Sequence, residues 1–405
     1  MPSNHIPSLR TLFGLNWMIF CLSDVRPGIG PFLSIFLASM PEWNTSRIGL
    51  ALGAMDLMAA ISQVPSGWLV DSLKIKRFLI FLACLAISVG CSLILNFPKL
   101  VPVIFAQALI GIAAALLPPA IAAITLGLVG RQSFPKRISI NETWGHAGNV
   151  ITAASVGIVG YLLGHQWILY MVIVFASGSI FFLGFINPKE INHRVARELP
   201  EENRQPLAPM PISQLFKETH LLAFCFACFL FHLSNAAQLP LVGQFLSKMN
   251  PKIDSLFMAG CIILAQFVMI GVAYSTGFLM NRWGRKPIFL LALGVLPIRA
   301  LLYTLTENPI LLLSIQLLDG IGAGIYGVIA VIIISDIAKD TGRFNFSFGL
   351  MALAQGAGAS ASNILAGYIA NQWGFNTSFI VLACIAIADL CFYGLCLPET
   401  KNQKA

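Results

Sequence analysis

Long apolar runs separated by short polar loops fill almost the whole chain. A helix needs about 20 apolar residues to cross a bilayer, and lipid offers the backbone no hydrogen-bond partner, so runs of this length must be helical. They predict helices near residues 12–38, 46–70, 78–96, 101–129, 138–163, 166–187, 219–247, 254–280, 287–306, 309–338, 345–371 and 374–397. The sequence therefore predicts an all-α membrane protein with twelve transmembrane helices.

One long hydrophilic segment, residues 188–217, is rich in charge and proline and divides the predicted helices into six and six. Three short motifs occur once in each half at nearly the same spacing: FCLSD at 20–24 and FHLSN at 231–235, GxL at 67–69 and 277–279, and QxLxGI at 107–112 and 316–321. Halves that repeat in this way are parallel structural repeats. We expect a six-helix bundle over 1–187, a cytoplasmic linker over 188–217, a second bundle over 218–397 and a cytoplasmic tail over 398–405.

The composition agrees with a membrane protein, because 57% of the residues are hydrophobic and only 10% are charged. The formal net charge is +8, and most Lys and Arg residues lie in the tails, the linker and the loops at one end of the predicted helices. The loops at the other end hold only Arg47, Lys99, Lys248 and Lys252. Since basic loops stay on the cytoplasmic side, both termini are predicted to be cytoplasmic. No basic face with interleaved aromatic residues is present, which argues against a nucleic-acid partner.

Sequence motifs for catalysis, metal binding or nucleotide binding are missing. The chain has neither an H-E-x-x-H zinc motif nor a P-loop. Cys225 and Cys228 form a C-x-x-C inside an apolar run, without a second pair to complete a metal site. We interpret all nine cysteines as small core residues and expect no enzymatic activity, metal or cofactor.

Two loops carry a common signature. Residues 67–77 read GWLVDSLKIKR, and residues 277–286 read GFLMNRWGRK. Both resemble the G-x-L-x-D-R-x-G-R-R/K signature of the major facilitator superfamily. The second copy departs from it at Asn281, which replaces the acid; the first keeps Asp71 but has Ser72 for the arginine and Lys74 for the glycine. Together with the helix number and the repeats, the resemblance covers essentially the whole chain.

The resemblance implies the major facilitator fold, with two pseudo-symmetric six-helix bundles, and secondary transport by alternating access. It also implies a gating element made of Gly67, Asp71, Arg77, Gly277, Asn281, Arg282, Gly284 and Arg285. Glycines at these positions allow helices to approach closely, and an acid can face the positive end of a helix dipole. The alternative is that the basic cluster of the first copy is only a topology signal.

Several charged residues lie within the predicted spans, where insertion costs about 2.5–3.5 kcal/mol and favours residues that face a cavity or a partner. Glu142, His146 and Asn149 follow one helical face at i, i+4 and i+7. An acid and an imidazole placed this way can take up protons, so Glu142 and His146, together with Asp24 and Asp56, are the proton-coupling candidates. The alternative is that Glu142 pairs with Arg137 or Arg131.

Other polar residues in the spans are candidates for a substrate path, namely Arg26, Asn149, His232, Asn235, Gln238, Arg299 and Asp319. Arg299 suits a carboxylate or phosphate group of a substrate. Alternatively, Arg299 and Asp319, on consecutive helices, form a structural ion pair. Asp389, near the middle of the last predicted helix, is left without a role.

The charged residues and the resemblance predict a secondary transporter that is coupled to protons. Analogy with shorter members of the superfamily, which have brief external loops, favours export of a small organic solute over uptake. Two alternatives are uptake of an organic anion, such as a polycarboxylate or metal-chelating metabolite, and a membrane scaffold or sensor without transport. The expected partners are the solute, protons and the lipid bilayer. We expect a monomer that spans a bacterial inner membrane many times.

Overall fold

The computed structural model describes residues 7–23, 29–193, 195–197, 217–338 and 344–400, and nearly all of them are helical. The first half contains α1 Leu9–Leu22, α2 Ile29–Ala38, α3 Thr45–Ser72, α4 Lys76–Asn96, α5 Leu100–Leu163 and α6 Gln166–Leu183. Two short 3-10 turns follow, Pro188–Glu190 and Val195–Arg197. The second half contains α8 Thr219–Asn235, α9 Gln238–Met249, α10 Asp254–Trp283, α11 Arg285–Tyr303, α12 Pro309–Ile337, α13 Phe344–Trp373 and α14 Phe375–Cys396.

The twelve predicted helices are present, although the chain is divided differently in three places. α1 and α2 together cover the first predicted helix, and α8 and α9 together cover the seventh. The fourth and fifth predicted helices run on as α5, with non-helical backbone at Gly130 between them. Gly130 has a φ of +72°, a conformation that costs glycine little, so the chain can reverse there without a long loop.

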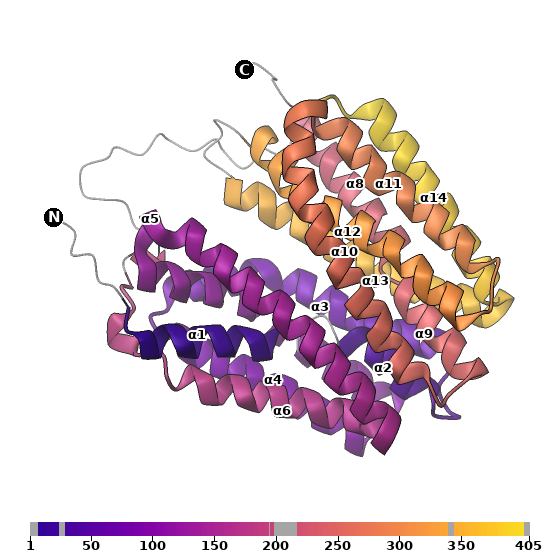
Figure 1. Ribbon diagram of the computed structural model, residues 1–405, viewed down its shortest axis with the longest axis horizontal. Helices are drawn as coiled ribbons and strands as arrows, with labels where there is room; N and C mark the ends of the chain where they lie inside the picture. The colour runs from indigo at the N-terminus through magenta and orange to yellow at the C-terminus, as the bar shows by residue number, and fades with distance from the viewer. Residues whose placement is uncertain (1–6, 24–28, 194, 198–216, 339–343, 401–405) are drawn as a thin grey trace.

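Each half has a core of its own. One cluster of buried apolar residues lies entirely between Leu15 and Ile191, and two others lie entirely between Leu221 and Leu397. Figure 1 shows two bundles that converge near α2 and α9 and diverge toward the end where the chain begins and ends. We call this end the terminal side and the other end the opposite side.

Ten helical stretches among the described residues are long and apolar enough to cross a membrane. α13 is not among them, because residues 355–363 read QGAGASASN and lower its hydropathy. Large apolar side chains such as Trp68, Phe105 and Leu395 are exposed, as is expected of a protein surrounded by lipid. Three cysteines on α14, Cys384, Cys391 and Cys396, are also exposed, so the prediction that every cysteine lies in the core was wrong.

The two bundles touch through small residues toward the opposite side. α3 packs against α13, α5 against α10, and α2 against α9. A Cβ atom at Gly49 would overlap the carbonyl oxygen of Asn363, and one at Gly157 would overlap the side chain of Ala259. Small residues at these crossings let the backbones approach without lost side-chain entropy. A cluster of buried apolar residues from both bundles also closes the opposite side. It consists of Phe32, Ile35, Ala153, Val156, Ile168, Met258 and Ala259.

Toward the terminal side the same helices separate. A Cβ atom at Gly67 on α3, at Gly271 on α10 or at Gly349 on α13 would meet nothing within 4 Å. A Cβ atom at Gly277 would also meet nothing within 4 Å, so neither Gly67 nor Gly277 is at a close helix crossing in this conformation, contrary to the expectation. The described conformation is closed at the opposite side and open at the terminal side.

Candidate functional site: a central cavity between the two bundles

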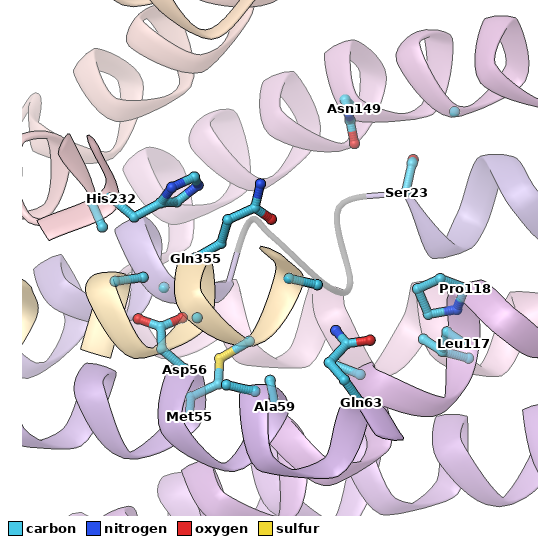
Figure 2. A pocket seen from close by; sticks show the side chains of 18 of the residues that line it. Ser23, Met55, Asp56, Ala59, Gln63, Leu117, Pro118, Asn149, His232 and Gln355 are labelled. Carbon is cyan, nitrogen blue, oxygen red and sulfur yellow. The ribbon is translucent and has the colours of Figure 1, made fainter. Parts of the chain in front are cut away.

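A cavity of about 950 Å³ lies between the two bundles. Such a volume falls within the roughly 300–1,000 Å³ typical of small-molecule sites. Residues of both halves line it, as Figure 2 shows for Asp56 and Gln63 from α3, His232 from α8 and Gln355 from α13. The site therefore belongs to neither bundle alone, and any movement of one bundle against the other changes its shape.

The polar face predicted on α5 lies in this cavity. Glu142, His146 and Asn149 all line it. His146 Nδ1 donates a hydrogen bond of 3.0 Å to Gln266 Oε1 on α10, so the imidazole connects the two bundles. Glu142 has no ion pair with a described residue, and the Arg137 guanidinium donates instead to the Asn16 side chain of α1. Glu142 thus lines the cavity without Arg137 as a partner, and the side chain of Arg131, the other predicted partner, lies outside the described part of the structure.

Asp56 lies where α3 crosses α13. Asn363 Nδ2 donates to Asp56 Oδ2 at 2.9 Å, and the Ser360 hydroxyl donates to the Gly53 carbonyl at 2.8 Å. Both bonds join the first bundle to the second. The charge state of Asp56 therefore bears on the strength of the main contact between the bundles.

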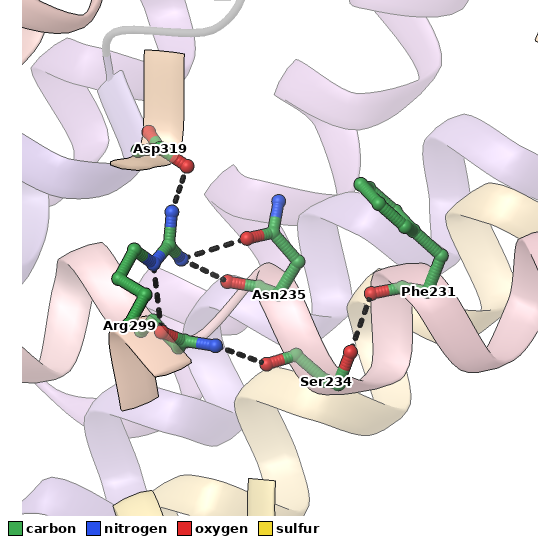
Figure 3. A network of polar contacts seen from close by, with 6 residues as sticks. Phe231, Ser234, Asn235, Arg299 and Asp319 are labelled. Atoms are coloured by element: carbon green, nitrogen blue, oxygen red, sulfur yellow. Dashed lines mark hydrogen bonds and ion pairs between the residues drawn. The ribbon is translucent and has the colours of Figure 1, made fainter. Parts of the chain in front are cut away.

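Arg299 sits at the centre of a polar network within the second bundle (Figure 3). Its Nε donates to Gln238 Oε1 at 2.8 Å, its Nη2 donates to Asn235 Oδ1 at 2.7 Å, and its Nη1 donates to Asp319 Oδ1. Arg299 is only 1% exposed. The structure thus shows the ion pair between Arg299 and Asp319, which was one of the two predicted alternatives. A substrate anion would have to displace these acceptors to reach the guanidinium.

His232 is oriented by its own helix. Its Nδ1 donates to the Cys228 carbonyl at 3.0 Å, which leaves Nε2 as the acceptor, and the ring packs edge-on against Tyr326 with centroids 5.1 Å apart. The side chain lies at the cavity wall in Figure 2. Two other predicted residues, Asp24 and Arg26, lie outside the described residues.

The opposite side is closed by a polar contact as well as by small residues. His165 Nε2, between α5 and α6, donates to both oxygens of Asp254 at the start of α10, at 2.8 and 3.0 Å. Asp254 is 1% exposed, and the Ser255 hydroxyl donates to it at 3.2 Å. Since these groups belong to different bundles, the contact must break when the opposite side opens.

We expect Asp254→Ala to weaken the closure of the opposite side. A buried hydrogen bond to a charged group contributes about 1.5–3 kcal/mol, so the ratio of closed to open molecules should fall by roughly tenfold to a hundredfold. Distances between spin labels at Lys99 and Lys252 report this opening. Glu307→Gln, an exposed acid on the same side, is the matched control, and an unchanged distance distribution in Asp254→Ala would contradict the role of this contact.

The signature loops are built differently in the two halves. In the first, the buried Lys76 ammonium donates to the carbonyls of Val70 and Leu73, and Arg77 donates to the Leu183 carbonyl at 2.9 Å. In the second, Gly284 has a φ of +95° and forms the turn into α11. Arg282 is exposed. The side chains of Asp71 and Asn281 lie outside the described part of the structure.

Sequence reasoning missed the acids that complete the second loop. Glu399, beyond α14, accepts the backbone N–H groups of Arg285 and Lys286 at 2.8 and 3.0 Å, which satisfies the N-terminus of α11. Arg285 Nε donates to Asp336 Oδ2 at 3.0 Å. Glu399 had no signal in the sequence beyond its place after the last apolar run. Its hydrogen-bond donors are backbone N–H groups, and a sequence does not show which backbone groups need an acceptor.

Comparison with known proteins identifies the family. The model of the Major Facilitator Superfamily matches residues 11–298 and 272–405. The chain belongs to the major facilitator superfamily. An uncharacterised MFS-type transporter of Mycobacterium tuberculosis, strain H37Rv, is 38% identical over 395 residues, which cover 97% of this chain and 94% of the relative. The chain is therefore a membrane transporter and not an enzyme.

Solved structures show the same major facilitator fold. A mutant form of the nucleoside transporter NupG aligns with a TM-score of 0.78 at 13% identity, over 96% of this chain and 99% of that one. A D-xylose-proton symporter aligns with a TM-score of 0.66 at 16% identity, over 98% of this chain and 99% of that one. At these identities the likeness establishes the fold alone.

Proposed function

We propose that this major facilitator protein exports a small organic solute from the cytoplasm in exchange for protons, by alternating access. The observation that carries the proposal is the central cavity, which is open on one side and contains an acid and an imidazole on one face of α5. Glu142 faces the cavity, and His146 bonds Gln266 of the other bundle. Proton binding at this pair therefore acts on a contact that must change when the bundles move.

The orientation of the two sides in the membrane is inferred from the charges of the loops. The described basic residues at the terminal side include Lys74, Lys189 and Arg282, whereas the opposite side holds Arg47, Lys99, Lys248 and Lys252. This asymmetry favours a cytoplasmic terminal side. The described conformation would then be open to the cytoplasm, ready to receive a solute for export. A monomer in a bacterial inner membrane is part of the same proposal.

The charge of the cavity favours a neutral or cationic solute. Asp56, Glu142 and Asp319 line the cavity, and Arg299 is the one Lys or Arg residue among its described lining. The guanidinium is already bonded to Asp319, Asn235 and Gln238. Asp56 and Glu142 have no ion pair with a described residue, so an organic anion in the cavity would lie close to two acids, which disfavours the uptake of polycarboxylates.

The test uses everted membrane vesicles that are acidified by respiration. Addition of a neutral or cationic solute should release protons from the lumen of vesicles with wild-type protein, and Glu142→Gln should abolish this release. Glu307→Gln, an exposed acid on the opposite side, is the matched control and should behave as wild type. Solute movement that persists unchanged in Glu142→Gln would remove this carboxyl from the coupling step.

A further inference from the structure

A buried acid lies outside the central cavity, within the second bundle. Asp389 is on α14 and is 0% exposed. It occupies the inward stripe of this helix, which otherwise buries residues such as Leu382, Ala386 and Tyr393. Neither carboxyl oxygen has a hydrogen-bond partner among the described residues. A carboxylate without a partner in such a place is costly, whereas a neutral carboxylic acid is far less so.

The polar groups nearest to Asp389 are a thiol and two phenolic hydroxyl groups. The Cys228 thiol of α8, the Tyr326 hydroxyl of α12 and the Tyr393 hydroxyl of α14 lie within electrostatic range of its carboxyl. Glu399 also acts on Tyr393, from the terminal side. From α11, the apolar residues Ile288, Phe289, Ala292, Leu293 and Leu296 belong to this core, and Lys286 donates to the Gly394 carbonyl of α14 at 2.7 Å. No described Lys or Arg forms an ion pair with Asp389.

A line of polar groups leads from this acid to the cavity. The Tyr326 hydroxyl interacts with the Cys228 thiol. Gln355 Nε2 donates to the Tyr326 hydroxyl at 2.8 Å, and Gln355 lines the cavity. The Tyr326 ring is fixed by stacking on Phe231, with centroids 4.0 Å apart. Tyr326 therefore lies within electrostatic range of the buried acid and is hydrogen-bonded to a residue that lines the central cavity.

We propose that Asp389 is a proton-binding site of the second bundle, occupied in the described conformation and connected to the central cavity through Tyr326 and Gln355. This deepens the proposed function, because it adds a proton-carrying group that is not itself part of the solute cavity. The ligand is a proton: it binds one oxygen of the carboxylate to give the neutral acid, and it leaves as that O–H bond breaks. Movement of the bundles that changes the Tyr326–Gln355 contact would control this exchange.

The test is infrared spectroscopy of the full chain, carrying aspartate labelled with carbon-13 at the carboxyl group, in lipid vesicles without added solute. At neutral pH the wild type should show a labelled C=O band of a protonated carboxyl group that is absent from Asp389→Asn. The band should shift upon transfer to deuterated water. Asp336→Asn, which removes an acid that forms an ion pair with Arg285, is the matched control and should keep the band.

Two further variants keep the test decisive. Asp389→Glu should move the band to the unlabelled position, which identifies the group even if Asp389→Asn does not fold. Tyr326→Phe keeps the stacked ring but should slow the deuterium shift several-fold. Absence of the band, or a band that never exchanges with the solvent, would overturn the proposal. Since no readout requires transport, the result stands apart from proton release in everted vesicles.

Discussion

Arg299→Ala is expected to destabilise the protein by about 3–5 kcal/mol, because it removes one partner of a buried ion pair. Truncation removes the donors that Asp319, Asn235 and Gln238 accept from, and leaves the Asp319 charge partly buried without its partner. Purified protein in detergent should accordingly unfold at a clearly lower temperature. Arg299→Lys should recover little, because one ammonium group does not reproduce the fork geometry of the guanidinium.

Two variants separate the charge from the packing. Arg299→Gln combined with Asp319→Asn removes both charges and should be closer to the wild type than Arg299→Ala, since no unpaired charge remains. Arg282→Ala removes an exposed arginine from α10 and should change stability by no more than about 0.5 kcal/mol. If Arg299→Ala unfolds at the temperature of Arg282→Ala, the network contributes no stability and its role must be sought in the cavity.

Gly49→Val is expected to drive the protein out of the described conformation. The new side chain would overlap the Asn363 carbonyl, where α3 and α13 cross near the opposite side. Overpacking of this kind costs about 1–3 kcal/mol, which shifts the conformational ratio by on the order of tenfold to a hundredfold. Spin labels at Lys99 and Lys252 should move apart, and labels at Lys74 and Arg282 on the terminal side should approach each other.

The same helix provides the control. A Cβ atom at Gly67, near the other end of α3, meets nothing within 4 Å. Gly67→Val should therefore leave the opposite side closed, although it places the same side chain on the same helix. An identical response of Gly49→Val and Gly67→Val would mean that valine perturbs α3 itself and that the crossing at Gly49 does not control the conformation.

The residues of the second bundle show how far sequence reasoning reaches. Arg299 and Asp319 are predicted as an ion pair or as substrate contacts because insertion into lipid makes any unpaired charge costly. That argument requires that Arg299 has hydrogen-bond partners but does not identify them. The acceptors Gln238 and Asn235 become evident only when α8, α9 and α11 are packed together. Glu399 and Gln266 were missed for the same reason, since their partners are distant in sequence.

The sequence by itself determined the membrane class, the twelve helices, the repeat and the family, because each depends on local periodicity or on short motifs within one segment. The tertiary structure alone decided which side is closed, that His146 and Asp56 reach across to the other bundle, and that Arg299 is already bonded. It also placed Asp389 among buried apolar residues inside the second bundle. The physical reason is that charge and hydrogen-bonding energies depend on distances between segments far apart in the chain, and these distances exist only once the helices have packed.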